Sequence, residues 1–365
     1  MNLSTLDTGL IFESLFISFV VSILMAVLST KFAIRTNLLD RPNAEPHKKH
    51  KHPVPISGGT ALIFTLLIVL VFFHSYIPKQ LWGLTLSSII IYLFSLYDDF
   101  KRLKWMYKLG GQIFGTAILI FTGTRTHLFE AKLFSSWLPA GLIPVCDILL
   151  TFFWIVFITN AFNLVDSADG LMIGISAWAE GFFIIAAMDA GQHAVALYCS
   201  ILLGASLALS FFNANPAILF MGDSGAQTTG FLLAALSIIY NPPELLQKNT
   251  WFLPVLMLGV PIFDTTLVTI SRWRKGEHFY HSGTDHTYHR LIRMGMSTIQ
   301  ASSFLHLVSF ALQSLAFFAI SQSVIEANTI FAIVVITGIF AIVFFEKESL
   351  WKFVTNLIHI NEHLT

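Results

Sequence analysis

Long apolar segments separated by short polar connections run through almost the whole chain. A bilayer core about 30 Å thick is crossed by a helix of roughly 20 apolar residues. Eleven segments approach that length, at about 10–33, 57–75, 81–97, 108–123, 140–160, 170–188, 192–212, 224–240, 250–271, 299–321 and 327–345. The sequence therefore predicts an all-α, polytopic membrane protein with about eleven transmembrane helices, forming a single domain over residues 1–365.

The composition excludes the main alternatives. Of 365 residues, 55% are hydrophobic and 12% are charged, whereas a soluble domain carries about 25% charged residues. A disordered chain would show low hydrophobicity and a high net charge. Lys+Arg and Asp+Glu number 21 each, and this zero net charge argues against a nucleic-acid binder. Cys146 and Cys199 lie inside apolar runs and predict neither a disulfide framework nor a zinc site.

The positive charges predict the orientation. Cytoplasmic connections carry an excess of Lys and Arg, and 17 of the 21 such residues fall on one side of the eleven segments. The opposite side holds only Lys79, Arg125, Lys132 and Lys248. We therefore expect an outside N-terminus, a cytoplasmic C-terminus and a multi-pass location in a bacterial cytoplasmic (inner) membrane.

Acidic residues gather on the same predicted cytoplasmic side, at the ends of four segments. They are Asp98, Asp99, Asp166, Asp169, Asp223 and Asp264. Taken alone, each group has a plainer explanation, such as a solvated helix end or a helix N-cap. Their joint occurrence favours a divalent-cation site, because Mg²⁺ is held by one or two carboxylates together with substrate phosphates.

Histidines follow the same pattern, since seven of the 13 lie in two predicted cytoplasmic loops: His47, His50, His52, His278, His281, His286 and His289. His286 and His289 are flanked by Asp285 and Arg290, which suits a contact to phosphate or to a metal, or a proton donor. Zinc has little support because no H-E-x-x-H spacing occurs. The first loop, with Lys48 and its neighbours, could equally touch lipid headgroups.

These residues together predict a cytoplasmic cleft at the boundary between water and lipid. Carboxylates would hold a divalent cation there, and Lys, Arg and His would hold phosphates. Chemistry that joins a soluble phosphorylated substrate to a lipid phosphate needs this placement.

The motifs resemble those of the polyprenyl-phosphate N-acetylhexosamine-1-phosphate transferases. In length and pattern the chain is most similar to WecA-type members of this family, and it is more distantly similar to MraY. The resemblance covers roughly residues 35–297, and its motifs are Asp40 to Asn43, His50 to Pro53 with Pro55, Gly58 and Gly59, Asp98-Asp99, Asn160 to Gly170, Asn213 to Gly225, and Pro261 to Asp264.

The resemblance implies a Mg²⁺-dependent reaction, with Mn²⁺ as an alternative, between a UDP-N-acetylhexosamine and undecaprenyl phosphate. The products would be undecaprenyl-diphosphate-sugar and UMP, and the reaction would initiate a cell-envelope polysaccharide such as O-antigen. It also implies contact with membrane lipid and, by analogy only, a homodimer.

The resemblance also implies roles for individual residues. The catalytic group comprises Asp98, Asp99, His286 and His289. The metal ligands are Asp223 and Asp98. Substrate contacts come from Lys48, Lys49, His50, Asn163, Asp166, Asp169, Asn213, Phe220 and Arg290, with Asp169 expected at the uracil. One of the paired Asp residues would deprotonate the lipid phosphate or help to hold the metal.

Three departures from the family pattern leave the donor sugar open. Arg102 stands near a position where many relatives carry a third acid, Ser167 replaces a usual Gly, and Tyr288 replaces a His. UDP-GlcNAc is the expected donor, with another UDP-HexNAc or an MraY-like UDP-muramoyl pentapeptide as alternatives. A secondary transporter is the alternative of another class, because Glu180 lies mid-way along segment 170–188, where an acid costs roughly 2.5–3.5 kcal/mol.

Overall fold

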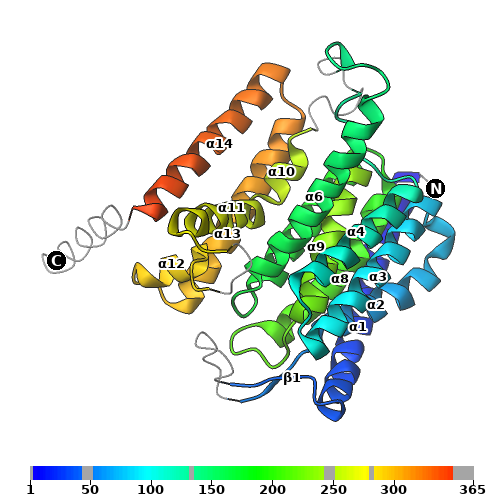
Figure 1. Ribbon diagram of the computed structural model, residues 1–365. Helices are drawn as coiled ribbons and strands as arrows, with labels where there is room; N and C mark the ends of the chain where they lie inside the picture. Colours follow the sequence, from blue (N-terminus) through cyan, green and yellow to red (C-terminus); the bar gives the residue numbers. More distant parts are fainter. Residues whose placement is uncertain (1–2, 43–51, 131–134, 242–250, 279–282, 348–365) are drawn as a thin grey trace, which may run out of the picture.

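The computed structural model describes residues 3–42, 52–130, 135–241, 251–278 and 283–347, and almost all of them lie in helices (Figure 1). The first half comprises α1 (Leu3–Arg35), β1 (Leu39–Asp40), β2 (Val54–Pro55), α2 (Gly58–Phe72), η1 (His74–Tyr76), α3 (Lys79–Lys101), α4 (Trp105–Phe121) and α6 (Ile143–Val165). The second half comprises α7 (Leu171–Asp189), α8 (His193–Asn213), α9 (Gly222–Ile239), α10 (Leu253–Met257), α11 (Gly259–Lys275), α12 (Thr287–Arg293), α13 (Thr298–Ile320) and α14 (Val324–Glu346).

The predicted helical class is confirmed. Within the described ranges, seven helices are long and apolar enough to cross a membrane, namely α1, α3, α6, α7, α8, α13 and α14. The other expected segments also lie on helices, but α2, α4 and α11 have only 15, 17 and 17 residues. The fold is that of a polytopic membrane protein, while the number of eleven crossings and the orientation stay predictions.

The segment expected at 250–271 is not one continuous helix, because α10 ends at Met257 and α11 begins at Gly259. Pro261 lies in the first turn of α11 and has no N–H to donate to the carbonyl four residues earlier. That carbonyl, on Met257, instead accepts a hydrogen bond of 3.1 Å from Nε2 of Gln313 on α13. Gln313 thus supplies the hydrogen-bond donor that Pro261 lacks at the break between α10 and α11.

The connections that carry the predicted site lie together at one end of the bundle, drawn at the bottom of Figure 1. The β1–β2 hairpin reaches the α8–α9 connection, where the N–H groups of Ser57 and Gly58 donate to the carbonyl of Phe220 at 3.1 and 3.0 Å. The α6–α7 connection reaches the same region, because the N–H of Gly170 donates to Oδ1 of Asn213. The alternating directions of successive helices therefore bring motifs that are far apart in the sequence to the same end of the bundle.

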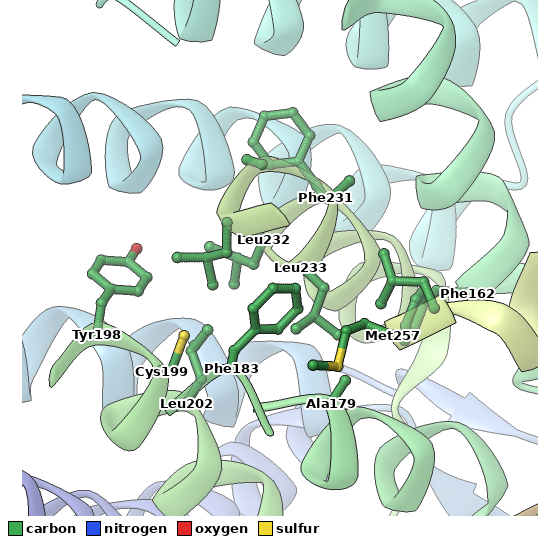
Figure 2. Packing of buried hydrophobic residues seen from close by; sticks show 14 of the residues in the cluster. Phe162, Ala179, Phe183, Tyr198, Cys199, Leu202, Phe231, Leu232, Leu233 and Met257 are labelled. Carbon is green, nitrogen blue, oxygen red and sulfur yellow. The ribbon is translucent and has the colours of Figure 1, made fainter. Parts of the chain in front are cut away.

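The core lies around α8 and α9, whose apolar residues face neighbours on several sides. Figure 2 shows Phe183 of α7 packed among Leu232 and Leu233 of α9, with Phe162 of α6 nearby. A helix that is hydrophobic all round is buried by its neighbours. Most residues of α8 are buried, whereas in α14 only Ala327 is buried. The centre of the bundle is therefore rigidly packed, and α14 is peripheral.

Serines at four-residue spacing fasten α1 to α8. Ser14 shares a hydrogen bond of 2.5 Å with Ser200, and Ser18 and Ser22 donate to the backbone carbonyls of Ile201 and Ala205. Small residues and hydrogen bonds between helices replace the hydrophobic effect inside a bilayer. The polar residues of α1 are therefore explained by packing and need no functional role.

Candidate active site

The adjacent carboxylates at the end of α3 have different partners. Asp99 accepts hydrogen bonds from the backbone N–H groups of Asp223 and Ser224 at 2.8 and 3.1 Å. It thereby caps the start of α9, which has no side-chain cap from its own N-cap residue. A carboxylate at this position satisfies free N–H groups and complements the helix dipole. Asp99 thus fixes the first turn of α9, which carries Asp223.

Asp98 instead shares a cation with Asp223. The ammonium of Lys108 on α4 lies 2.6 Å from Oδ2 of Asp223 and forms a second ion pair with Asp98. Nδ2 of Asn163 on α6 donates to the other oxygen of Asp223 at 2.8 Å. Arg102 makes this convergence possible, because its left-handed conformation (φ 49°) ends α3 and turns the chain back into α4.

The pair of carboxylates fits a Mg²⁺ site of the kind that is completed by substrate. Asp98 and Asp223 come from two helices and point at one positive group, the ammonium of Lys108. Among the residues the structure describes, no group of three or more His, Cys, Asp or Glu side chains is arranged to hold a metal. That is consistent with Mg²⁺, which takes one or two carboxylates and completes its shell with water and phosphate oxygens.

Asp166 adds a further negative charge beside this group. It ends α6 as the C-cap residue, with its N–H bonded to the carbonyl of Phe162. Burial raises the pKa of Asp166 to about 8, and the charges of Asp223, Asp99 and Asp169 act in the same direction. The four carboxylates therefore repel one another, which disfavours full ionisation without a cation.

Asp169 and Asn213 shape the neighbouring α8–α9 connection. Oδ2 of Asp169 accepts from Nδ2 of Asn215 at 3.2 Å and from the N–H of Ala217 at 3.1 Å. Asn213 is buried, and its amide is engaged on both sides by backbone, with Nδ2 donating to the carbonyl of Leu219. Asp169 and Asn213, both expected to contact the nucleotide, thus hold the α8–α9 connection in place. Phe220 in this connection forms an isolated β-bridge with Ile56.

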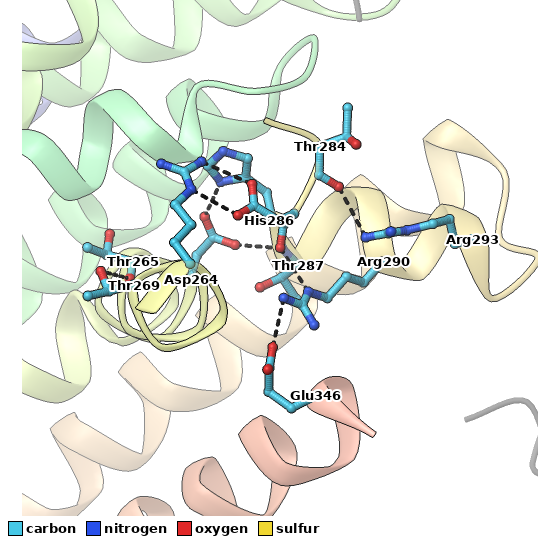
Figure 3. Close-up of polar contacts among 11 residues, drawn as sticks. Asp264, Thr265, Thr269, Thr284, His286, Thr287, Arg290, Arg293 and Glu346 are labelled. Carbon is cyan, nitrogen blue, oxygen red and sulfur yellow. Dashed lines mark hydrogen bonds and ion pairs between the residues drawn. The ribbon is translucent and has the colours of Figure 1, made fainter. Parts of the chain in front are cut away.

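The predicted histidines lie at the start of α12, with His286 held by a buried carboxylate. Nδ1 of His286 lies 2.9 Å from Oδ2 of Asp264 on α11, and the other oxygen accepts from the N–H of Thr287 at 2.7 Å (Figure 3). The ring centroids of His286 and His289 are 6.2 Å apart. Asp264 therefore fixes the ring orientation of His286, as a carboxylate bonded to one ring nitrogen does for many functional histidines.

The histidine segment faces the acidic loops. Burial raises the pKa of Tyr288, and the negative charge of Asp169 acts in the same direction. Arg290 donates to the carbonyls of Asp285 and Phe345 and pairs with Glu346, and its contact with substrate stays a prediction. The expected contacts of Lys48, Lys49 and His50 lie outside the described residues.

Sequence reasoning missed three features of the site. One is the pairing of Lys108 with Asp98 and Asp223. Another is the contact between Asp264 and His286. Below Lys108 and Asp223, one turn further into the bundle, Gln112 and Gln227 are joined by a hydrogen bond of 3.0 Å. Gln112 follows Lys108 by four residues and Gln227 follows Asp223 by four, so each lies one turn along the same helix face.

Gln112 also exchanges hydrogen bonds with Asn160 on α6, at 3.3 and 2.8 Å. The three amides therefore link α4, α6 and α9 directly beneath the carboxylates. Such a network is stabilising when its members are satisfied. It fixes the relative positions of the three helices that carry Lys108, Asn163 and Asp223.

Glu180, the acid expected inside the membrane, is buried in α7 and accepts a hydrogen bond of 3.0 Å from Ser206 on α8. It therefore faces the bundle interior, as an intramembrane acid is expected to do.

The chain combines a polytopic helical bundle with carboxylates, a lysine and histidines at one end, and this combination defines a membrane-embedded transferase. The model of glycosyl transferase family 4 matches residues 81–241. The chain is 28% identical to the probable undecaprenyl-phosphate N-acetylglucosaminyl 1-phosphate transferase of Bacillus subtilis (strain 168), covering 86% of each chain. It is 30% identical to a phospho-N-acetylmuramoyl-pentapeptide-transferase of Bacillus cytotoxicus, covering 70% of this chain and 80% of that one.

A further relative is the undecaprenyl-phosphate alpha-N-acetylglucosaminyl 1-phosphate transferase of Escherichia coli (strain K12), 26% identical over 87% of this chain and 85% of the other. The chain belongs to glycosyl transferase family 4. It is therefore an enzyme, a phosphotransferase, and this membership decides against the transporter alternative.

Proposed function

We propose that the chain transfers N-acetylglucosamine-1-phosphate from UDP-GlcNAc to undecaprenyl phosphate and releases UMP. The names of the Bacillus subtilis and Escherichia coli relatives support this reaction. The observation that carries it is the convergence of Asp98 and Asp223 on Lys108, at the end of the bundle where charged loops gather. The site would face the cytoplasm of a bacterial inner membrane and start a cell-envelope polysaccharide such as O-antigen.

The geometry suggests separate tasks for the two adjacent carboxylates. Bound Mg²⁺ would neutralise the diphosphate of the donor. Asp98 and Asp223 would hold it, because both reach one cationic position. Asp99 would position Asp223, because both of its oxygens already accept backbone N–H groups. Asp98 is then the member of the pair that would accept the proton of the lipid phosphate, on the oxygen that pairs with the mobile side chain of Lys108 rather than on the one that accepts the backbone N–H of Leu103.

In the direct route, an oxygen of the lipid phosphate attacks the β-phosphorus of UDP-GlcNAc. The bond between that phosphorus and the bridging oxygen breaks, and UMP leaves with its electron pair. Lys108 would move from the carboxylates to the phosphates. His286 in its imidazolium form, with Nδ1–H held by Asp264, would donate to the diphosphate from Nε2–H. A two-step route through an aspartyl intermediate is the chemical alternative.

A second sugar nucleotide also has support as the donor. A phospho-N-acetylmuramoyl-pentapeptide-transferase is 30% identical to the chain, which keeps UDP-MurNAc-pentapeptide as an alternative donor. Assays of UMP release with undecaprenyl phosphate and each of UDP-GlcNAc, another UDP-HexNAc and UDP-MurNAc-pentapeptide distinguish these donors. Turnover of the pentapeptide alone would replace the GlcNAc proposal.

The metal assignment is tested with a matched pair of acids. Asp223→Ala should abolish Mg²⁺-dependent UMP release, because one of two carboxylates that share the cation is lost. Asp189→Asn is the control, since this exposed acid ends α7 at the opposite end of the bundle from Gly170. Equal activity of the two purified variants would reject Asp223 as a metal ligand.

A further inference from the structure

The last described helix, α14, packs on the bundle through a few partly buried side chains, among them Phe331 and Val334. Among its side chains only Ala327, near the start, is buried, while Ile333, Ile339 and Phe340 are exposed. The other end differs, because the carboxylate-bearing side chain of Glu346 is only 9% exposed. Apolar packing along α14 does not account for the burial of an acid at its end.

Glu346 lies between two arginines from two other helices. Its Oε1 is 3.0 Å from Nη2 of Arg290 on α12, and its Oε2 is 3.1 Å from Nη1 of Arg274 on α11. Arg290 also donates from Nη1 to the carbonyl of Phe345 at 2.8 Å. Figure 3 shows Glu346 directed at Arg290 from the end of its helix. The end of α14 is thus fastened to the segment that carries the histidines.

The contact continues from Arg290 to the backbone before His286. Nε of Arg290 donates to the carbonyl of Asp285 at 2.8 Å. The carboxylate of Asp285 accepts two hydrogen bonds from Arg272 on α11, at 2.9 and 3.0 Å. The residue next to His286 is therefore held through its carbonyl by α12 and through its side chain by α11. Glu346 holds the guanidinium that makes the first of these contacts.

The charges around Glu346 explain why its removal should disturb Arg290. Three arginines, Arg272, Arg274 and Arg290, lie around two carboxylates. Without Glu346, the 11% exposed side chain of Arg290 keeps, within the described part of the chain, only backbone carbonyls as partners. An arginine left buried without its carboxylate moves toward water. That movement would release the carbonyl of Asp285 and with it the position of His286.

We infer that Glu346 is a positioning residue for the transfer reaction, because it orients the His286 segment through Arg290. This inference rests on the proposed function, in which His286 contacts the diphosphate. It couples the last described helix to the chemistry, although that helix contributes no residue to the carboxylate site. Its partner Arg274 is 53% exposed and contributes little, as exposed ion pairs do.

The test compares two variants of the full-length protein that both break the Glu346–Arg274 pair. Glu346→Gln also breaks the pair with Arg290, and we expect it to lower kcat about 10- to 100-fold, because small displacements of catalytic groups have effects of this size. KM for UDP-GlcNAc should change by less than about threefold. Arg274→Gln should keep kcat within about twofold of the unchanged protein. Glu346→Asp, which retains the charge, should recover part of the loss.

Backbone hydrogen exchange supplies a readout that does not depend on activity. The N–H of Thr287 should exchange faster in Glu346→Gln and at the original rate in Arg274→Gln, because only the former frees Arg290. Unchanged exchange and kcat in Glu346→Gln, or equal losses in both variants, would overturn the inference. Should Glu346→Gln fail to fold, Glu346→Asp takes its place against Arg274→Gln, and its fall in kcat and rise in exchange of the Thr287 N–H should be smaller but still larger than those of Arg274→Gln. If the unchanged protein releases no UMP, the proposed function is rejected. The exchange comparison would still test whether Glu346 holds the His286 segment through Arg290.

Discussion

The most direct test of the site geometry is a methyl group added at Gly222. This residue begins α9 with φ +70°, a left-handed conformation that side chains rarely adopt. A Cβ there would lie 2.3 Å from Cγ2 of Ile56 and 3.0 and 3.1 Å from the carboxylate oxygens of Asp99. Gly276 is a matched control, because it has the same φ of +70° and no atom within 4 Å of its own Cβ position.

The expected magnitudes follow from this difference. The left-handed conformation costs an alanine about 1 kcal/mol at either position. Overpacking against a filled neighbourhood adds about 1–3 kcal/mol, and only Gly222 has such neighbours. Gly222→Ala should therefore destabilise the protein by about 2–4 kcal/mol and Gly276→Ala by about 1 kcal/mol. Because the added methyl pushes Asp99 away from α9, the former should also abolish most UMP release.

Thermal unfolding of the detergent-solubilised protein is measured with a thiol-reactive dye. The buried Cys199 becomes accessible when the bundle opens, and Cys146 is partly accessible already. UMP release is measured in parallel on the same preparations. If the two alanine variants have equal unfolding temperatures and equal activity, the close contact between Gly222 and Asp99 does not control the site, and the reasoning is refuted.

Three further substitutions test the surroundings. Lys108→Gln should reduce UMP release, yet Mg²⁺ should raise its unfolding temperature more than that of the unchanged protein, because no ammonium competes for the carboxylates. Gln112→Leu should cost about 1–3 kcal/mol in thermal unfolding, because it removes the hydrogen bonds of Gln112 with Asn160 and Gln227 in the buried amide network. Asp285→Asn should cost about 3 kcal/mol in the same assay, because the buried Arg272 loses its carboxylate.

The helices and the site region could be predicted because each has a local signature. Apolar runs fixed the positions of the helices, and acids at segment ends indicated Asp98, Asp99, Asp166 and Asp223. The structure brings these four together. The break at Leu258 was also readable in retrospect, from Pro261 and its missing N–H.

The pairings could not be predicted because they depend on how helices face one another. Asp98 and Asp99 are neighbours in sequence, and successive helical side chains point about 100° apart. One therefore reaches Lys108 and the other reaches the start of α9. The pairing of Arg290 with Glu346 joins residues 56 positions apart, and no pattern in either helix indicates it. Long-range charge pairs of this kind require the fold.

The crowding of carboxylates predicts how stability depends on pH. Burial and neighbouring charges raise the pKa of Asp166 to about 8 in the folded protein, against about 3.9 in the unfolded chain. Folding thus binds a proton between these values, so that the Mg²⁺-free protein is expected to lose stability as the pH rises from about 4 to about 8. Asp166→Asn carries no titrating group and should show a flatter profile.

Added Mg²⁺ should reduce the loss for the unchanged protein, because a cation between Asp98 and Asp223 lowers the cost of ionising Asp166. The measurement is the unfolding temperature at several pH values, with and without Mg²⁺, for both proteins. The lysine between the carboxylates offsets only one negative charge, and the remainder is what a divalent cation would neutralise. Identical pH profiles for the two proteins would mean that Asp166 does not feel the charges of Asp223 and Asp99, and would contradict the compact acidic site.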